Sequence, residues 1–300
     1  MTLHGLVAVS LAAGLDAVFG EPPDHLHPVA WLGTVIGWLD RSWPASELVG
    51  ALIALGLPLL VAGLVTTGLT ALTIVDPWLA ALGVGLTLYT ATSLRMLRDR
   101  AESVLELSGT DPDAARTAVP ALVGRDPASL SGPELRSAAV ESAAENLADG
   151  LVAPLVAFAV LTPVSLPAAA GGAAWVKAVN TLDSMFGYPD HPLGTASARL
   201  DDLVMWLPAR VTALLLVVVE RSPGTLVRAR SWAHEPPSPN AGWPMATIAA
   251  LLDVRLAKPG VYELNPDASL PAVDIGRTGL DIITRTGRLA FGITGVIAWL

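Results

Sequence analysis

Three carboxylates stand at helical spacing in the segment AAVESAAENLADG. Glu141, Glu145 and Asp149 are each four residues apart, which places them on one face of a predicted Ala-rich helix, with Asn146 beside them. Like charges stacked in this way repel one another. The pattern therefore predicts one of two things: a solvated helix face, or a site for Mg²⁺ and a phosphate ligand, because that ion takes oxygen ligands.

A second group of polar residues lies in the segment KAVNTLDSMFGY. Lys177, Asn180, Thr181 and Ser184 follow the i, i+3, i+4, i+7 pattern of one helix face. Polar groups on a face that a membrane helix would leave apolar indicate contact with water or a polar ligand. Lys177 is predicted either to extend to the membrane interface or to pair with a phosphate or carboxylate. Asp183 lies off this face and is interpreted as a cap or a second metal ligand.

The segment SARLDDLVMWLPAR combines cations and carboxylates around an apolar stretch. Asp201 and Asp202 are adjacent, so they cannot share one helix face; one is interpreted as a helix N-cap and the other as a metal ligand. Arg199 precedes them. Arg210 follows within the apolar stretch, where a charge needs a carboxylate or phosphate partner.

Two further polar segments are rich in proline. GEPPDHLHPVAWLG contains Glu21, His25 and His27, and is interpreted as a rigid loop at the membrane surface, since a zinc site would need ligands that no second cluster supplies. SPNAGWP predicts a turn at Pro239 and Asn240, followed by a helix. The sequence contains no P-loop, dinucleotide-binding, zinc-protease or nucleophile-elbow motif.

Long uncharged runs must position these segments. The run 48–75 is followed by 77–94, with Asp76-Pro77 as a tight turn between them, and the pair predicts a transmembrane hairpin because about 20 apolar residues cross a bilayer. Prolines interrupt the run 150–176, which predicts a broken or re-entrant segment. With one run counted as re-entrant, we expect about five membrane segments from these six runs: 3–19, 48–75, 77–94, 150–176, 203–219 and 289–300.

The stretches 95–149 and 220–288 are polar and contain six and eight of the 18 basic residues. The positive-inside rule places both in the cytoplasm. Helix-spaced patterns with little strand-like alternation predict an all-α, polytopic integral membrane protein with helical cytoplasmic stretches, forming a single domain over 1–300. We expect it in the plasma (inner) membrane, with its active site facing the cytoplasm.

Composition excludes several functional classes. The chain of 300 residues is 52% hydrophobic and only 15% charged, whereas soluble domains have about a quarter of their residues charged. Its formal net charge of −9 disfavours a nucleic acid partner. It has no cysteine, which excludes disulfides, thiolate nucleophiles and cysteine-ligated metals.

The chain resembles the CobD/CbiB family of cobalamin biosynthesis proteins, the adenosylcobinamide-phosphate synthases, in five segments taken in order. These are GEPPDHLHPVAWLG, ESAAENLADGLVAP, KAVNTLDSMFGY, SARLDDLVMWLPAR and SPNAGWP. Two positions depart from the family's pattern. Met245 stands where members often carry an acidic residue, and Met205 where they often carry asparagine, so neither is expected to be an essential ligand.

The resemblance implies an ATP-dependent amide ligase. Such an enzyme joins a propionate carboxyl of the corrinoid adenosylcobyric acid to (R)-1-amino-2-propanol or its phosphate, giving adenosylcobinamide or its phosphate. ATP and Mg²⁺ are the implied cofactors, because an unactivated carboxylate must first become a good acyl donor, most simply an acyl phosphate. The lipid bilayer and other enzymes of cobalamin synthesis are the implied partners, and nucleic acid is not.

For an enzyme with that activity, we assign the candidate residues to three sets of roles as hypotheses. Predicted catalytic residues are Glu141, Glu145, Lys177, Asp183, Asp201 and Asp202. Predicted substrate or phosphate ligands are Asn146, Asn180, Arg199, Arg210, Asn240, Glu21 and His27. Predicted metal ligands are Glu145, Asp149, Asp201 and Asp202.

Two other classes of protein compete with this interpretation. A membrane corrinoid carrier or transporter would line a path with Lys177, Asp183 and Arg210, and should show paired half-length repeats that the sequence lacks. A non-catalytic membrane sensor would not need the carboxylate and amide segments described above.

Overall fold

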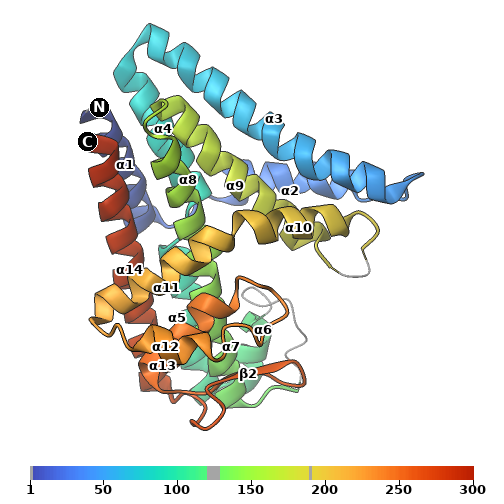
Figure 1. Ribbon diagram of the computed structural model, residues 1–300, viewed down its shortest axis with the longest axis vertical. Coiled ribbons are helices and arrows are strands. Elements are labelled where there is room, and N and C mark those ends of the chain that lie inside the picture. The colour runs from blue at the N-terminus through green and yellow to red at the C-terminus, as the bar shows by residue number, and fades with distance from the viewer. Residues whose placement is uncertain (1–2, 120–128, 189–190) are drawn as a thin grey trace. The chain divides into compact units, whose positions relative to one another are not determined.

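The computed structural model describes residues 3–119, 129–188 and 191–300. Helices make up most of the chain (Figure 1). The elements are α1 (Leu3–Phe19), the 3₁₀-helix η1 (Asp24–Leu26), α2 (Pro28–Leu39), α3 (Ser46–Val75), α4 (Pro77–Ala91), α5 (Arg95–Thr110), α6 (Pro112–Ala118), α7 (Gly132–Leu147), the π-helix η3 (Ala148–Val152), α8 (Ala153–Leu161), α9 (Leu166–Phe186), α10 (Gly194–Val204), α11 (Trp206–Glu220), α12 (Thr225–Arg230), α13 (Gly242–Leu252), β1 (Leu256–Lys258), β2 (Tyr262–Leu264) and α14 (Val273–Trp299).

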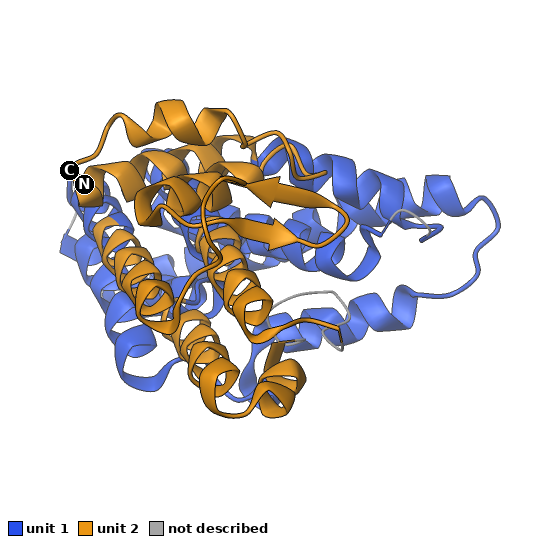
Figure 2. Ribbon diagram, turned by 90° about the horizontal axis from the view of Figure 1, so that it is seen from below, with its two compact units in different colours: residues 1–93, 149–205, 290–300 blue, residues 94–148, 206–289 orange. Residues whose placement is uncertain are grey.

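The chain divides into two compact units (Figure 2). Unit 1 comprises residues 1–93, 149–205 and 290–300, and unit 2 comprises 94–148 and 206–289. Each unit is assembled from separate stretches of sequence, so neither is a consecutive domain. The prediction of a single domain over 1–300 stays a prediction.

Proline and short polar side chains start several of these helices. Asp76 caps α4, since its Oδ1 accepts hydrogen bonds from the amides of Trp78 at 2.8 Å and Leu79 at 3.0 Å, with Pro77 in the first turn. Ser165 caps α9 in the same way, accepting from the amide of Ala168 at 3.2 Å. The predicted tight turn at Asp76-Pro77 is therefore confirmed.

In unit 1, α3 runs along α9, α1 packs on α4, and α8 and α9 form a helical hairpin (Figure 1). Small residues allow the closest of these approaches. A Cβ on Gly171 of α9 would collide with the Thr66 hydroxyl of α3 and come within 3.0 Å of the Ala62 carbonyl oxygen. Backbones that approach this closely fix how α3 and α9 cross.

Two helices are long and apolar enough to cross a membrane: α3, and the continuous helix Gly132–Leu161 formed by α7, η3 and α8. Counting the bent pair α10 and α11 as one span gives up to three among the described residues. These helices support an all-α membrane protein, and the expected total of about five segments is not confirmed. The span at 48–75 corresponds to α3.

Three predicted segments differ from the structure in their boundaries. The segment 77–94 is a helix of only 15 residues that ends at Ala91. The run 150–176 is not one segment: its first part continues the helix from α7, and the chain then turns at residues 162–165 into α9. The tail 289–300 is the end of α14, which begins at Val273. The helices of α7–η3–α8 and α14 continue into polar sequence, whereas α4 ends inside an uncharged run, so runs of apolar residues alone misplaced the ends.

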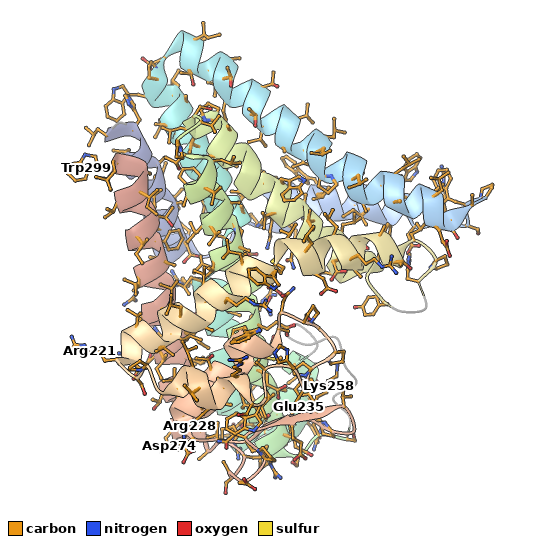
Figure 3. All side chains as sticks on the ribbon, viewed as in Figure 1. Arg221, Arg228, Glu235, Lys258, Asp274 and Trp299 are labelled. Atoms are coloured by element: carbon orange, nitrogen blue, oxygen red, sulfur yellow. The ribbon has the colours of Figure 1, made fainter. Side chains whose placement is uncertain are left out.

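Unit 2 contains the one departure from an all-α fold in the described residues, a two-stranded antiparallel sheet. Leu256 of β1 pairs with Leu264 of β2, and Lys258 pairs with Tyr262. The side chains of Leu256 and Leu264 are fully buried, which gives this short hairpin an apolar face to pack. Figure 3 labels Lys258, together with Arg228, Glu235 and Asp274, among the many polar side chains of the stretch 220–288.

Candidate functional site

Lys177 lies at the centre of a charged cluster in unit 1. Its ammonium is within electrostatic range of Glu21, which follows α1, and of Asp149, in the π-helix η3. His27, at the start of α2, is also within range of Lys177. The structure thus brings together residues from three of the five polar segments, although more than 120 positions separate Glu21 from Asp149 in the sequence.

His27 is buried and takes part in both local structure and the cluster. Its Nδ1 accepts a hydrogen bond from the amide of Val29 at 3.2 Å and so caps α2, and its Nε2 lies 3.7 Å from Oε2 of Glu21. Burial lowers the pKa of His27 from 6.5, Glu21 opposes this effect, and Lys177 reinforces it. The neutral imidazole is favoured, since a protonated Nδ1 could not accept the capping bond.

Two further residues of this cluster were not predicted as site residues. Asp16 on α1 is 3% exposed, and both Asp16 and Glu21 lie within electrostatic range of the Tyr89 hydroxyl on α4. The sequence did contain a signal for Asp16: it is a carboxylate inside the apolar run 3–19, and burying a charge is costly unless other groups compensate it. Tyr89 carried no comparable signal in the sequence.

The π-helix η3 positions Asp149. The amide of Ser93 donates to the carbonyl oxygen of Gly150 at 3.1 Å, which holds η3 against the end of α4. Glu141 and Glu145 lie on α7, and Asp149 follows in η3, the second residue of the π-helical turn that continues α7. Glu141 and Glu145 belong to unit 2, whereas Asp149 belongs to unit 1. The shared carboxylate face predicted from spacing stays a prediction.

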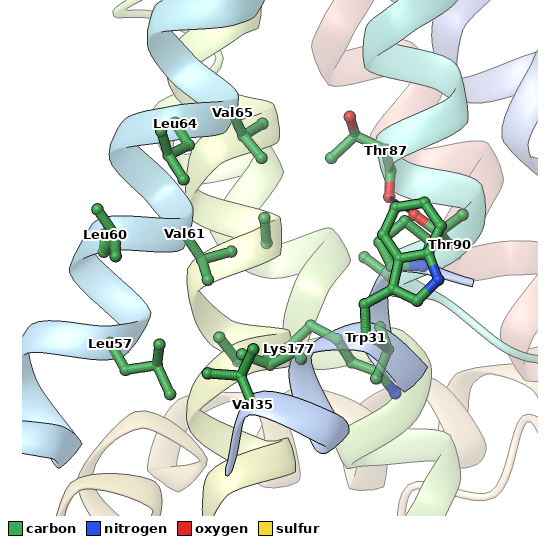
Figure 4. A pocket seen from close by; sticks show the side chains of 16 residues that line it. Trp31, Val35, Leu57, Leu60, Val61, Leu64, Val65, Thr87, Thr90 and Lys177 are labelled. Carbon is green, nitrogen blue, oxygen red and sulfur yellow. Dashed lines mark hydrogen bonds between the residues drawn. The ribbon is translucent and has the colours of Figure 1, made fainter. Parts of the chain in front are cut away.

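An apolar cavity of about 420 Å³ adjoins Lys177, bounded by α2, α3, α4 and α9. Figure 4 shows aliphatic side chains of α3, including Leu60 and Leu64, on one wall, with Trp31 and Thr90 across from them. Lys177 is the charged member of this lining, and the expectation that its face meets water or a polar ligand stays a prediction. Further along α9, Thr181 donates to the Lys177 carbonyl oxygen at 2.7 Å, so its hydroxyl is satisfied within the helix.

Asp183 and Asp202 form a second acidic pair in unit 1, between the last turn of α9 and α10. Burial raises the pKa of Asp183 to about 6, and the charge of Asp202 adds to this effect. The Oδ1 atom of Asp183 is buried without a hydrogen-bond partner. Asp201 neighbours Asp202 on α10 and is half-buried, and Asn180 on α9 is half-buried as well.

Glu141 lies in a buried network of unit 2. Its Oε1 accepts a hydrogen bond from Ser137 at 2.7 Å, and its Oε2 accepts one from the Tyr262 hydroxyl at 2.6 Å. Ser137 in turn accepts from the amide of Ala257 on β1 at 2.8 Å. This network joins α7 to the β-hairpin, and the catalytic role of Glu141 stays a prediction.

Arg210 joins the fourth and fifth polar segments within unit 2. Its guanidinium donates to Oδ1 of the buried Asn240 at 2.7 Å and to the carbonyl oxygen of Trp206 at 2.8 Å, and it lies over the rings of Trp206 and Trp243. The guanidinium is thus surrounded by an amide, backbone carbonyls and aromatic faces, and its expected carboxylate or phosphate partner stays a prediction. These groups stabilise a cation without neutralising it.

The other predicted residues are more exposed. Arg199 and Asn146 are exposed and Glu145 is half-buried, with the Asn146 amide donating to the Ser142 carbonyl oxygen at 3.0 Å. Met205 and Met245, the two departures from the family's pattern, are buried. Over the part of the chain that the structure describes, no group of three or more histidine or acidic side chains could hold a metal ion. The metal-ligand roles of Glu145, Asp149, Asp201 and Asp202 stay predictions.

Comparison with known proteins decides the family. The family model described as CobD/Cbib protein matches residues 9–289. The chain belongs to the CobD/CbiB family. This finding confirms the resemblance carried by the five segments, and it supports a role in cobalamin biosynthesis.

Similar proteins from other organisms support this assignment, and the alignments cover most of each chain. A probable cobalamin biosynthesis protein CobD of Methanothrix thermoacetophila is 34% identical over 93% of this chain and 92% of its own. The cobalamin biosynthesis proteins CobD of Rhodobacter capsulatus and Mycobacterium tuberculosis are 39% and 40% identical, over 84% and 85% of this chain and 82% of their own. No solved structure matches the chain.

Proposed function

We propose that this protein is an ATP-dependent amide ligase of adenosylcobalamin synthesis. It attaches (R)-1-amino-2-propanol, or its phosphate, to a propionate carboxyl of adenosylcobyric acid. The observation that carries the proposal is the cluster around Lys177. Glu21, His27, Asp149 and Lys177 come from three of the five segments that carry the resemblance to the CobD/CbiB family, and they lie near one another in unit 1.

The composition of this cluster suits phosphoryl chemistry. Lys177 is the cation that would contact a phosphate of ATP or of an acyl phosphate intermediate, where it offsets the charge that develops during transfer. Mg²⁺ commonly binds through one or two protein carboxylates together with substrate phosphates. Asp149 and Glu21 are carboxylates near Lys177 and could fill that role without a third acidic ligand.

A base is also needed, because the attacking amine must lose a proton as the amide forms. Asp183 has a raised pKa of about 6 and is the candidate in unit 1, near Asp202. Arg199 is exposed on α10 and suits a phosphate of either substrate. In unit 2, Asn240 and Arg210 form a polar pair suited to an amide or phosphate group.

The test uses purified protein reconstituted in lipid vesicles with adenosylcobyric acid, aminopropanol phosphate and Mg-ATP. Mass spectrometry follows the product, with and without ATP. We expect ATP-dependent adenosylcobinamide phosphate. Corrinoid binding without an ATP-dependent product would reject the ligase and favour a carrier.

The variant Lys177→Ala tests whether Lys177 contributes to catalysis. We expect a loss of kcat of about 100-fold or more, because removing one donor to a developing charge commonly costs that much. Lys258→Ala is the matched control, since Lys258 on β1 is the chain's only other lysine. Equal turnover by both variants would remove Lys177 from the catalytic residues.

A further inference from the structure

We propose that the cavity between α2, α3, α4 and α9 binds one acyl chain of a membrane phospholipid. Its volume of about 420 Å³ lies toward the lower end of the range of about 300–1,000 Å³ for ligand sites. The site shares Lys177 with the charged cluster of the proposed ligase, and its other lining side chains are aliphatic, aromatic or threonine. It is an apolar compartment next to that cluster.

The lining of the cavity has few polar groups that could bond to a ligand. The hydroxyls of Thr87 and Thr90 line the cavity, but they donate to the carbonyl oxygens of Gly83 at 2.9 Å and of Thr87 at 3.1 Å. Lys177 is the one charged residue of the lining, and Glu21 and Asp149 compensate its charge. A ligand that needs hydrogen bonds would lose its contacts with water here without replacing them.

Several residues that line the cavity are exposed on a helix that could cross a membrane. Leu60 and Leu64 line it and yet are 57% and 66% exposed, on a helix long and apolar enough to cross a membrane. On the opposite wall Trp31 is 54% exposed, and its indole donates to the His25 carbonyl oxygen at 3.2 Å (Figure 4). Tryptophan with a bonded ring nitrogen is typical of the membrane interface. The proposal therefore places a lateral entrance for lipid at these exposed residues of α2 and α3.

An acyl chain fits this site better than the proposed substrates do. A corrinoid has a rim of amides, and an amino alcohol phosphate is charged, so either would be buried with unpaired polar groups. An acyl chain needs no hydrogen bonds and enters from the bilayer without crossing water. It gains close packing against leucine and valine side chains that would otherwise face a void.

The experiment measures lipid that remains with the protein. The full chain is purified in mild detergent from phosphatidylethanolamine–phosphatidylglycerol membranes, and extracted lipid is counted per protein by mass spectrometry. Ala174→Phe places a ring in the cavity from α9, and Val61→Trp does so from α3. We expect the wild type to retain one tightly bound phospholipid that both variants lose.

Ala71→Phe and Val75→Trp are the matched controls, since both positions are exposed on α3 away from the cavity. They should retain the lipid. Equal retention by cavity and control variants would overturn the proposal, as would displacement of the lipid by adenosylcobyric acid. Because the readout is lipid content, a failed ligase assay leaves this result unaffected.

Discussion

At the scale of single residues, burial sets the protonation states of two groups in unit 1: His27, in the cluster around Lys177, and Asp183, beside Asp202. His27 caps a helix through the lone pair of Nδ1, and its pKa is lowered by burial. Asp183 is in the opposite situation, since burial favours its protonated, neutral form. Each group therefore makes the stability of the fold depend on pH, over a different window.

His27 should destabilise the protein on acidification. Its pKa is lowered in the folded state, so the unfolded chain binds more protons, and stability falls as the pH decreases through 6.5 toward the folded value. His27→Asn keeps a side-chain cap for α2 and should remove this dependence. Thermal unfolding in detergent between pH 5 and 8 tests it. His25→Asn, at an exposed position, is the control and should behave as the wild type does.

Asp183 should produce the reverse dependence. Its folded pKa of about 6 exceeds the ordinary value of 3.8, so stability falls as the pH rises between these values. Asp183→Asn removes the charge and should stabilise the protein at pH 7.5, by about 1 kcal/mol after allowance for partial solvent exposure. The gain should vanish near pH 4, as seen in melting temperatures. An equal gain from the exposed Asp267→Asn would show that the effect is not specific.

At the scale of elements, close helix packing shapes unit 1. Gly171 of α9 faces Thr66 and Ala62 of α3, and α3 and α9 both border the apolar cavity. Inside a membrane the hydrophobic effect does not drive helices together, so close van der Waals contact between small residues carries much of the packing.

Gly171→Leu should force α3 and α9 apart. We expect a destabilisation of about 1–3 kcal/mol, the usual cost of overpacking a tight contact. Gly68→Leu on α3 is the matched control, because a Cβ there meets nothing within 4 Å. Thermal unfolding of both variants in the same detergent gives the comparison. A similar melting temperature for the two variants would contradict the packing that the structure shows.

At the scale of the whole molecule, the membrane spans organise the chain. The 30-residue α3 is long enough to cross a bilayer and follows Arg41 and Ser42, so the positive-inside rule predicts its beginning in the cytoplasm. Its other end, near Ile74, should then lie on the far side. This orientation is a proposal that the absence of cysteine makes easy to test.

Single-cysteine variants can be labelled without any background from native thiols. We expect Ser42→Cys to react with a membrane-impermeant maleimide only in inside-out vesicles, and Ile74→Cys only in right-side-out vesicles. Mass shift on gels reports the labelling. Reaction of both positions from the same side would mean that α3 does not span the bilayer.

The sequence alone determined the membrane character, the helical class and the family. Each of these rests on local signals: uncharged runs, proline and aspartate at helix starts, and five ordered segments. Tertiary structure decided which of those segments meet. Lys177, Glu21 and His27 converge because α9 and α2 pack in one unit, and no local pattern encodes that contact.

The same reason explains what local patterns left open. Spacing predicted one face for Glu141, Glu145 and Asp149, but it could not predict that Glu141 would accept a hydrogen bond from Tyr262, 121 positions away. Arg210 was expected to need an anion; packing supplies the amide of Asn240, 30 positions away, and the anionic partner stays a prediction. Local propensity determines which residues form helices, whereas long-range packing determines which buried polar groups are paired, and with what.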